Sequence, residues 1–416
     1  MTDSWPQFRT NLGKISSLVT SGSRGWAEYY SNSGALFLRM TNLPKEGIHL
    51  MFHDKKYVCL PSTTSEGQRT RVQKDDILIS ITAELGKIGF VENELGEAYV
   101  NQHVALVRLS SEKVFPKFVA YYLAETEQRN LWQRLNDAGA KAGLNLQTIN
   151  KYPLSLPLLE QQIAISGLLS TWDKAIEKAE RLIEAKKKNL IRLSSSMLFG
   201  KHLLGIDGNQ TKWFLVPKHW EIKKIGHIAH EISLTNTLEE RLPVLSCTKY
   251  DGLVDSLKYF DKQIFSDDTS KYKIIKKGQF AYATNHIEEG SIGYQDLYPK
   301  GLVSPMYTVF ETNNEVIDGY LYKVLKTETF RHIFEINTSA SVDRRGSLRW
   351  SQFSSLPIPM PPLKEQEEIN DVLDLASKEI ILLKQLLESY KKQKRGLMQK
   401  LLTGQWRAKI GQKEVV

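Results

Sequence analysis

The sequence predicts an α+β protein built by internal duplication, with two mixed α/β domains that are each followed by a long helix. The stretch PLLEQQ at 157–162 returns as PLKEQE at 362–367. Behind each copy, apolar residues recur at spacings of mostly three to five, which is typical of a helix with one apolar face. With 416 residues, the chain is also too long for a single core of ordinary size.

The two copies align with a shift of 205 at their start and of 204 further on. The first shift matches these residues: Pro157, Leu158, Glu160 and Gln161 with Pro362, Leu363, Glu365 and Gln366. The second shift matches Gly200 with Gly404. A proline before the first turn, a glutamate within it and a glycine after the last turn are start and stop signals of helices. Each helix should run about 40 residues, or roughly 60 Å.

A long helix with one narrow apolar stripe must bury that stripe, and the nearest partner in the chain is the other copy. We expect an antiparallel coiled coil with pseudo-twofold symmetry, because each helix leaves its domain at its N-terminal end. The alternative is that each helix packs only on its neighbouring domain. The predicted boundaries are a first domain at 1–156, a helix at 157–204, a second domain at 205–358, a helix at 359–405 and a tail at 406–416.

The domains repeat each other as well as the helices. The segment at 98–109, AYVNQHVALVRL, matches GLVSPMYTVFET at 301–312 with a shift of 203. The segments QKDDILISITAELGKIGF at 73–90 and KKGQFAYATNHIEEGSIGY at 276–294 also correspond. Short β-branched and aromatic runs separated by Gly, Asp and Asn indicate strands of a compact mixed domain.

The composition, with 41% hydrophobic and 25% charged residues, is that of a globular protein rather than a disordered or membrane one. No secretion signal or membrane-spanning run is evident, so we expect a cytoplasmic protein. Cys59 and Cys247 lie far apart and are expected to be buried reduced thiols. The net charge of +9 permits a polyanionic partner such as nucleic acid without proving one.

These features together resemble the DNA specificity subunit of type I restriction-modification enzymes. The resemblance covers essentially the whole chain and includes the helix starts LPLLEQQ and PPLKEQE, the strand KDDILIS and the segment WFLVPKHWEIKKIGHI at 213–228. It implies that each domain is a target recognition domain reading one half of a bipartite DNA target. The two helices would set the spacer between the half-sites and dock methyltransferase subunits.

The resemblance also implies that the chain is not catalytic and holds no cofactor of its own. Two methyltransferase subunits would use S-adenosylmethionine to methylate adenine N6, and restriction subunits would use ATP and Mg to cleave double-stranded DNA. The sequence contains neither the Asn/Asp-Pro-Pro-aromatic motif of an adenine methyltransferase nor a phosphate-binding G-x-x-x-x-G-K-[ST] loop. Paired histidines at 49 and 53 and at 227 and 230 lack a third ligand, so no metal site is predicted.

Two other classes compete with a DNA reader: an enzyme that modifies or cuts DNA itself, and a coiled-coil scaffold. Duplicated domains with basic, polar loops favour the reader. Base readout uses Arg, Asn and Gln side chains, whereas Lys, Ser and Thr mostly hold phosphates. The candidates in the first domain are Arg24, Arg39, Asn42, Arg69, Arg71 and Lys141. Those in the second are Lys249, Tyr250, Asn285, His286, Arg344 and Arg345. The alternative for each is a solvated loop residue or one that packs in the domain.

The candidate docking residues for partner subunits are the polar residues repeated at the two helix starts: Glu160, Gln161, Glu365 and Gln366. Repetition in both copies would let them meet the same partner surface. The alternative is that the carboxylates only stabilise the helix starts, at about 0.3 to 1 kcal/mol each.

Overall fold

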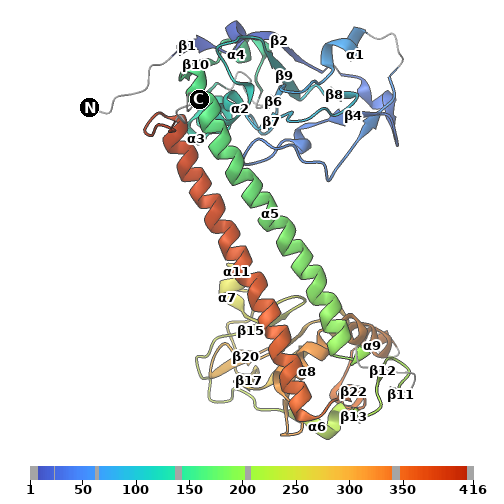
Figure 1. The fold of residues 1–416 in the computed structure, drawn as a ribbon. Coiled ribbons are helices and arrows are strands. Elements are labelled where there is room, and N and C mark those ends of the chain that lie inside the picture. The colour runs from blue at the N-terminus through green and yellow to red at the C-terminus, as the bar shows by residue number, and fades with distance from the viewer. Residues whose placement is uncertain are drawn as a thin grey trace. The chain divides into compact units, whose positions relative to one another are not determined.

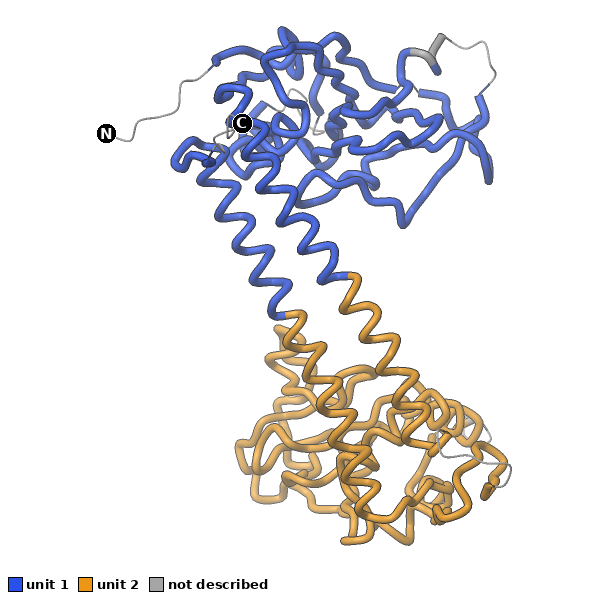
Figure 2. Tube along the Cα trace, viewed as in Figure 1, with its two compact units in different colours: residues 1–180, 385–416 blue, residues 181–384 orange. Residues whose placement is uncertain are grey.

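The computed structural model describes residues 8–22, 24–60, 65–135, 143–201, 208–339 and 347–409. It divides into two compact units, residues 1–180 with 385–416 (unit 1) and residues 181–384 (unit 2), as Figure 2 shows. Each unit combines one α/β domain with part of both long helices. No helix in the described part of the chain is long and apolar enough to cross a membrane.

Unit 1 is built around an antiparallel sheet in the order β2-β9-β6-β7 (Figure 1). Its strands are β2 (Ser16–Ser21), β9 (Val104–Leu109), β6 (Ile77–Ser80) and β7 (Ile88–Phe90). A second sheet consists of β3 (Tyr30–Ser31), β5 (Tyr57–Val58), β4 (Ala35–Leu38) and β8 (Ala98–Val100). The strands β1 (Phe8–Asn11) and β10 (Pro153–Leu156) pair antiparallel.

The helices of the unit 1 domain are α1 (Ser65–Thr70), α2 (Pro116–Ala124), α3 (Thr126–Arg134) and α4 (Leu146–Asn150), with 3-10 turns η1 (Gly13–Ile15), η2 (Trp26–Tyr29) and η3 (Met40–Asn42). All four residues of β6 are buried, which explains why Ile77, Leu78 and Ile79 are apolar in succession rather than alternating with polar residues. Its Ile77 and Ile79 share a core with Phe118 of α2.

Unit 2 repeats the central sheet in the order β14-β21-β18-β19. The strands are β14 (Ala229–Ile232), β21 (Tyr307–Thr312), β18 (Phe280–Ala283) and β19 (Ile292–Tyr294). The antiparallel pairs around it are β11 (Gly208–Gln210) with β12 (Leu215–Pro217), β13 (Glu221–Lys224) with β22 (Pro357–Met360), β15 (Leu245–Thr248) with β16 (Gly252–Asp255), and β17 (Lys273–Lys276) with β20 (Lys300–Val303). Its short helices are α6 (Ile225–Ile228), α7 (Ser256–Phe260), η5 (Ile287–Glu289), α8 (Asp318–Leu325), α9 (Glu328–Ser339) and α10 (Trp350–Phe353).

The duplication extends to polar pairs at the edge of each core. Asp76, just before β6, is fully buried and accepts hydrogen bonds from Arg108 Nε and Nη2 at 2.8 and 2.7 Å. At the matching place before β18, Gln279 Nε2 donates to Glu311 Oε2 at 2.9 Å. The same position is thus filled by an ion pair in unit 1 and by an amide and a carboxylate in unit 2.

The long helices are α5 (Leu159–Met197) and α11 (Leu363–Leu402), and they pair antiparallel within each unit. In unit 1 the ring centroids of Trp172 and Tyr390 lie 5.8 Å apart, and Asp173 pairs with Lys394. In unit 2, Lys186 Nζ lies 2.8 Å from an oxygen of Glu379. Because residue numbers rise along one helix as they fall along the other, the predicted antiparallel coiled coil is confirmed.

Both helices also end as their glycines indicate. Gly200 and Gly404 have φ angles of 60° and 79°, in the left-handed region that closes a helix and that glycine adopts without steric cost. Just before these glycines, Leu198 and Phe199 pack in the core of unit 2, and Leu401 and Leu402 pack in the core of unit 1. Each domain core is therefore completed by the end of the helix that follows the other domain in the chain.

Candidate nucleic-acid interface

Three chain segments of unit 1 meet where β6 ends and β9 begins. The N–H of Ile81 donates to His103 O at 3.1 Å, and the N–H of Leu144 donates to Ile81 O at 2.9 Å. A fourth segment joins these three, since the N–H of Gly22 donates to Asn101 O at 3.2 Å. A Cβ at Gly22 would lie only 2.3 Å from a backbone oxygen of this turn, so the close approach requires glycine.

Unit 2 has the same arrangement where β18 ends and β21 begins. The N–H of Leu348 donates to Thr284 O at 3.0 Å, and the hydroxyl of Thr284 donates to Met306 O at 3.0 Å. Ser304 Oγ accepts from the N–H of Met306 at 3.3 Å, as Asn101 Oδ1 does from His103. We call these two regions the loop ends of the units, comprising residues 22, 81–84, 101–103 and 143–144 in unit 1 and 284–289, 304–306 and 348 in unit 2.

Several predicted DNA-binding residues lie near the loop end of unit 1. Arg24 is exposed and follows Gly22 by two residues. Arg69 is exposed and its Nη1 donates to Thr20 Oγ1 at 2.9 Å, near the end of β2. Arg71 is exposed, but its carbonyl accepts from Arg108 at 3.0 Å, close to the end of β9 opposite the loop end. Lys141, Arg344 and Arg345 lie outside the residues that the structure describes.

The prediction for Asn42 is wrong, because its side chain is 1% exposed and holds the local backbone. Asn42 Oδ1 accepts from the N–H of Arg39 at 2.9 Å, and Nδ2 donates to Met51 O at 2.9 Å. Arg39 remains a candidate, although its guanidinium is 20% exposed and donates to a carboxylate oxygen of Asp54 at 2.6 Å. Any contact of Arg39 with DNA would compete with that ion pair.

The structure brings the described unit 2 candidates together through a lysine that the sequence did not single out. Lys326 Nζ donates to Lys249 O at 2.7 Å and to Gly290 O at 2.9 Å. It thereby ties the turn that carries Lys249 and Tyr250 to the turn that follows His286. Tyr250 is 78% exposed, and Lys249 Nζ lies 5.2 Å from its ring centroid. Burial lowers the pKa of the Lys326 ammonium.

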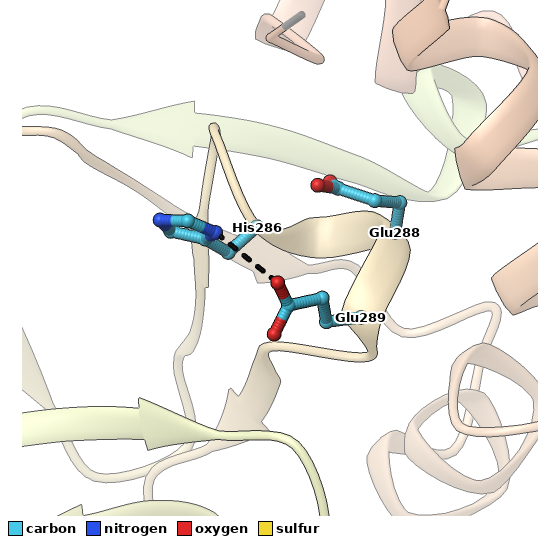
Figure 3. A group of neighbouring side chains, drawn as sticks. All are labelled: His286, Glu288 and Glu289. Atoms are coloured by element: carbon cyan, nitrogen blue, oxygen red, sulfur yellow. Dashed lines mark ion pairs between the residues drawn. The ribbon is translucent and has the colours of Figure 1, made fainter. Parts of the chain in front are cut away.

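The loop that carries Asn285 and His286 also contains two carboxylates (Figure 3). Asn285 is half-buried, and its Oδ1 lies 3.2 Å from Thr284 Oγ1. His286 Nδ1 lies 3.5 Å from Glu289 Oε1, and ligand atoms of His286, Glu288 and Glu289 lie within 4.8 Å of one another. These are neighbouring residues of one surface turn, and two of them form an ion pair, so the group by itself identifies no metal site.

Sequence reasoning missed the turn between β8 and β9, where Gln102 and His103 lie beside Thr82. His103 Nδ1 is 2.8 Å from Thr82 Oγ1, and His103 Nε2 is 3.1 Å from Gln102 Nε2. In unit 2 the corresponding residues are Pro305 and Met306, whose side chain is 60% exposed. The signal was available, since the matched segments differ as NQH against SPM between two strands.

The register assumed for the docking candidates is also wrong at one position. Gln162, rather than Gln161, is the structural counterpart of Gln366. Gln162 Oε1 accepts from the N–H of Phe115 at 2.8 Å, and Gln366 Oε1 accepts from that of Ile317 at 2.8 Å. Both amides also donate to two carbonyls, and both side chains are at most 1% exposed. Gln366 is therefore not accessible for docking.

The other docking candidates differ in their exposure and in the hydrogen bonds that their side chains already make. Glu160 is exposed. Gln161 exchanges two hydrogen bonds with the backbone of Ala408, at 3.1 and 3.2 Å. Glu365 accepts from Trp220 Nε1 at 2.9 Å and lies 3.0 Å from His219 Nε2, which fixes the start of α11 to the segment before β13.

Exposed apolar side chains offer a different docking signal on the helices. Leu158 and Ile163 near the start of α5 in unit 1 are 62% and 49% exposed. On α11 in unit 2, Val372, Leu375 and Leu382 are 42%, 70% and 55% exposed. Their spacing of three and seven residues places them along one side of α11, apart from the buried Leu373 and Ile380.

Comparison with known proteins identifies one family. The chain matches the family described as type I restriction modification DNA specificity domain over residues 58–187 and 217–391. It is 23% identical over 362 residues to a putative type I restriction enzyme MjaX specificity subunit of Methanocaldococcus jannaschii, covering 80% of this chain and 79% of that protein. It is 28% identical over 128 residues to the type I restriction enzyme EcoBI specificity subunit of Escherichia coli, covering 30% and 26%.

Two solved structures have the same fold. The S subunit of a type I restriction-modification system from M. genitalium superposes with a TM-score of 0.56 at 14% identity, covering 96% of this chain and 97% of that one. The HsdS subunit from Thermoanaerobacter tengcongensis gives 0.53 at 14% identity, with coverage of 96% and 97%. The α+β architecture predicted from the duplication is thus confirmed.

Proposed function

Since the chain belongs to the family of type I restriction-modification DNA specificity subunits, we propose that its two loop ends read the two halves of a bipartite DNA target. Recognition of a DNA target is the function of this family. The observation that carries the proposal is that both units build the same three-segment loop end but fill it with different side chains, such as Gln102 and His103 against Pro305 and Met306. The same backbone arrangement with two different sets of side chains would allow the two units to recognise two different half-sites.

Electrostatics supports the same assignment. The chain has a net charge of +9, and Arg24 and Lys249 are exposed near the loop ends. Such cations bind phosphates and release counterions, which positions a reader on the duplex without specifying sequence. Two readers on one side of a duplex contact half-sites about one helical turn, or 34 to 36 Å, apart. In this proposal α5 and α11 set that spacing.

Catalysis belongs to the partners in this proposal. Specificity subunits are generally non-catalytic. Two methyltransferase subunits would dock on the helices and use S-adenosylmethionine to methylate adenine, and restriction subunits would use ATP and Mg to cut DNA in the cytoplasm. Leu375 and Leu382, 70% and 55% exposed on α11, support an apolar docking surface there. Glu160 supports a polar contact at the start of α5.

Long-read mapping of methylated adenines tests the proposed function. Cells that carry this gene and its neighbouring methyltransferase gene are compared with cells that lack only this gene. A split motif that disappears with the gene is the expected result. Persistence of every methylated motif would contradict DNA specificity, and a continuous motif would contradict reading by two units.

The same assay separates docking from recognition. A Leu375→Glu, Leu382→Glu variant should lose methylation at all sites while the purified chain keeps its DNA preference, because the charge opposes apolar docking. Glu379→Gln, on the same helix, is the matched control and should leave the motif methylated. Full methylation by the double variant would remove this face of α11 from the docking surface.

A further inference from the structure

The turn between β8 and β9 holds the amide side chain of Gln102 at the loop end of unit 1. The N–H of Val104 donates to Asn101 O at 3.2 Å, which closes a turn with Gln102 and His103 at its centre. Asn101 is anchored in turn, since its N–H donates to Leu38 O at 3.1 Å and its Oδ1 accepts from the N–H of His103 at 3.1 Å. The backbone that carries Gln102 is therefore fixed from both sides.

The side chains of the turn form a chain of hydrogen bonds that runs from Gln102 through His103 to Thr82. Gln102 Nε2 lies 3.1 Å from His103 Nε2, and an amide nitrogen can only donate. With the amide placed in this way, His103 Nε2 accepts, and its Nδ1 lies 2.8 Å from Thr82 Oγ1. Rotating the amide by 180° would bring its oxygen against the same ring nitrogen, which would then donate from Nε2 while Nδ1 accepts from the Thr82 hydroxyl, so His103 holds the amide by one hydrogen bond in either orientation.

One hydrogen-bonding edge of Gln102 remains after this chain is formed. Its second N–H and its Oε1 have no hydrogen-bond partner within the described residues, and the side chain is only half-buried. A neighbouring donor and acceptor on one amide match adenine, which offers N7 as acceptor and N6 as donor in the major groove. Guanine offers two acceptors there and would face the amide oxygen.

We propose that Gln102 reads an adenine in the half-site of unit 1 and that His103 is the residue that positions it. The inference rests on the proposed function, because it needs the loop end to face DNA. The matching turn of unit 2 cannot make this contact, since Pro305 and Met306 carry no amide. The adenine contact made by Gln102 thus belongs to one half-site only.

The test is methylation mapping in cells that express the full chain with its methyltransferase, using Gln102→Ala and Gln102→Glu. Gln102→Ala should keep the second half-site and the spacer but lose the requirement for one A·T pair of the first half-site. Discrimination at that pair should fall about 10- to 100-fold, the usual contribution of one bidentate contact. Gln102→Glu accepts but does not donate, so its preference at the same pair should move toward cytosine N4.

Glu112→Gln is the matched control, because Glu112 is exposed and lies beyond the opposite end of β9. His103→Phe keeps the ring shape but not the hydrogen bonds, and should relax the same base pair by a smaller factor. Relaxation elsewhere would overturn the positioning role of His103. Measuring base preference rather than total methylation separates that role from a structural one.

An unchanged motif in both Gln102 variants overturns the inference and leaves the proposed function standing. Loss of all methylation by both variants, with the assembled complex still recovered, also overturns it, because Gln102 would then fix more than one base. If the unmodified chain determines no split motif, the proposed function itself fails. The three results are distinguishable in one sequencing experiment.

Discussion

Asp173 on α5 joins the two long helices to the domain of unit 1, so a substitution of Asp173 measures how much these contacts stabilise the unit. Its carboxylate accepts hydrogen bonds from Lys394 Nζ on α11 and from the hydroxyl of Tyr121 on α2, and lies 3.0 Å from His49 Nε2. Its side chain is 11% exposed. Burial by itself would raise the pKa of Asp173, but the hydrogen bond from His49 and the charges of Lys394 and His49 lower it to about 2.

The size of the effect follows from that pKa. The difference between the ordinary 3.8 and about 2 corresponds to about 2 kcal/mol of stability. Because the folded pKa is the lower one, this contribution is complete above pH 3.8 and is lost as the pH falls toward 2. Asp173→Asn removes it and also leaves Lys394, whose side chain is 9% exposed, without its anion. We expect a loss of about 2 to 4 kcal/mol at pH 7.

The assay is urea unfolding of the full chain at pH 7 and at intervals from pH 4 to 2, with hydrogen exchange of α2 reporting on unit 1. Asp173→Asn should be destabilised at pH 7 and should converge with the unmodified chain near pH 2. The control is Glu379→Gln, whose partner Lys186 and own side chain are 36% and 46% exposed, so its effect should stay below about 1 kcal/mol. An Asp173→Asn variant within about 0.5 kcal/mol of the unmodified chain at pH 7, or one with the same acid dependence, refutes the reasoning.

Three further predictions concern the shared frame and the DNA contacts. Gln162→Ala and Gln366→Ala should each lower the free energy of unfolding of their own unit by about 1 to 3 kcal/mol, because each leaves one buried N–H and two carbonyls unpaired. Hydrogen exchange of the N–H groups of Phe115 and Ile317 measures the loss, and full protection of these groups in the variants would contradict the prediction. Asp76→Ala should lower the free energy of unfolding of unit 1 by about 3 kcal/mol, because it leaves the guanidinium of Arg108 without its carboxylate partner. This loss, measured by thermal unfolding, should be larger than that caused by Gln279→Ala in unit 2, and equal losses would contradict the prediction. Lys249→Ala should weaken DNA binding to all sequences and reduce the salt slope of log K by about 0.9, as measured by anisotropy, and an unchanged slope would remove it from the interface.

The sequence predicted the helices well because their signals are local. An apolar stripe, a preceding proline and a following glycine act within a few residues, and α5 begins two residues after Pro157 while α11 begins one residue after Pro362. The antiparallel pairing followed from the duplication, since a stripe needs a partner and the copy supplied one. These inferences required no knowledge of which residues are distant in the chain but close in space.

The wrong predictions, for Gln161 and Asn42, concern side chains whose roles depend on contacts that the local sequence does not reveal. Aligning Gln161 with Gln366 followed the identity of the letters EQ, whereas the structure matches Gln162 through bonds to a backbone 47 residues away. Asn42 has the composition of a base reader, but its hydrogen bonds to Arg39 and Met51 use it to hold a turn. Polar side chains that satisfy buried backbone groups look the same in a sequence as those that face solvent.

The residues that hold the backbone are similar in the two units, whereas the residues at the centre of the turns at 101–104 and 304–307 differ. This contrast explains how one duplicated fold can read two different half-sites. Where the chain holds its own backbone, the units use the same group or a close substitute: Gln162 and Gln366 bind matching N–H groups, and Asn101 and Ser304 brace matching turns. At the centre of those turns the side chains differ, with the Gln102 amide held by His103 in unit 1 and the Met306 thioether in unit 2. A frame that does not depend on the turn residues lets them change without loss of stability, so base preference in each half can vary independently. Exchanging residues 102–103 for Pro-Met should therefore alter one half-site, leave the other intact and change the free energy of unfolding by less than about 1 kcal/mol.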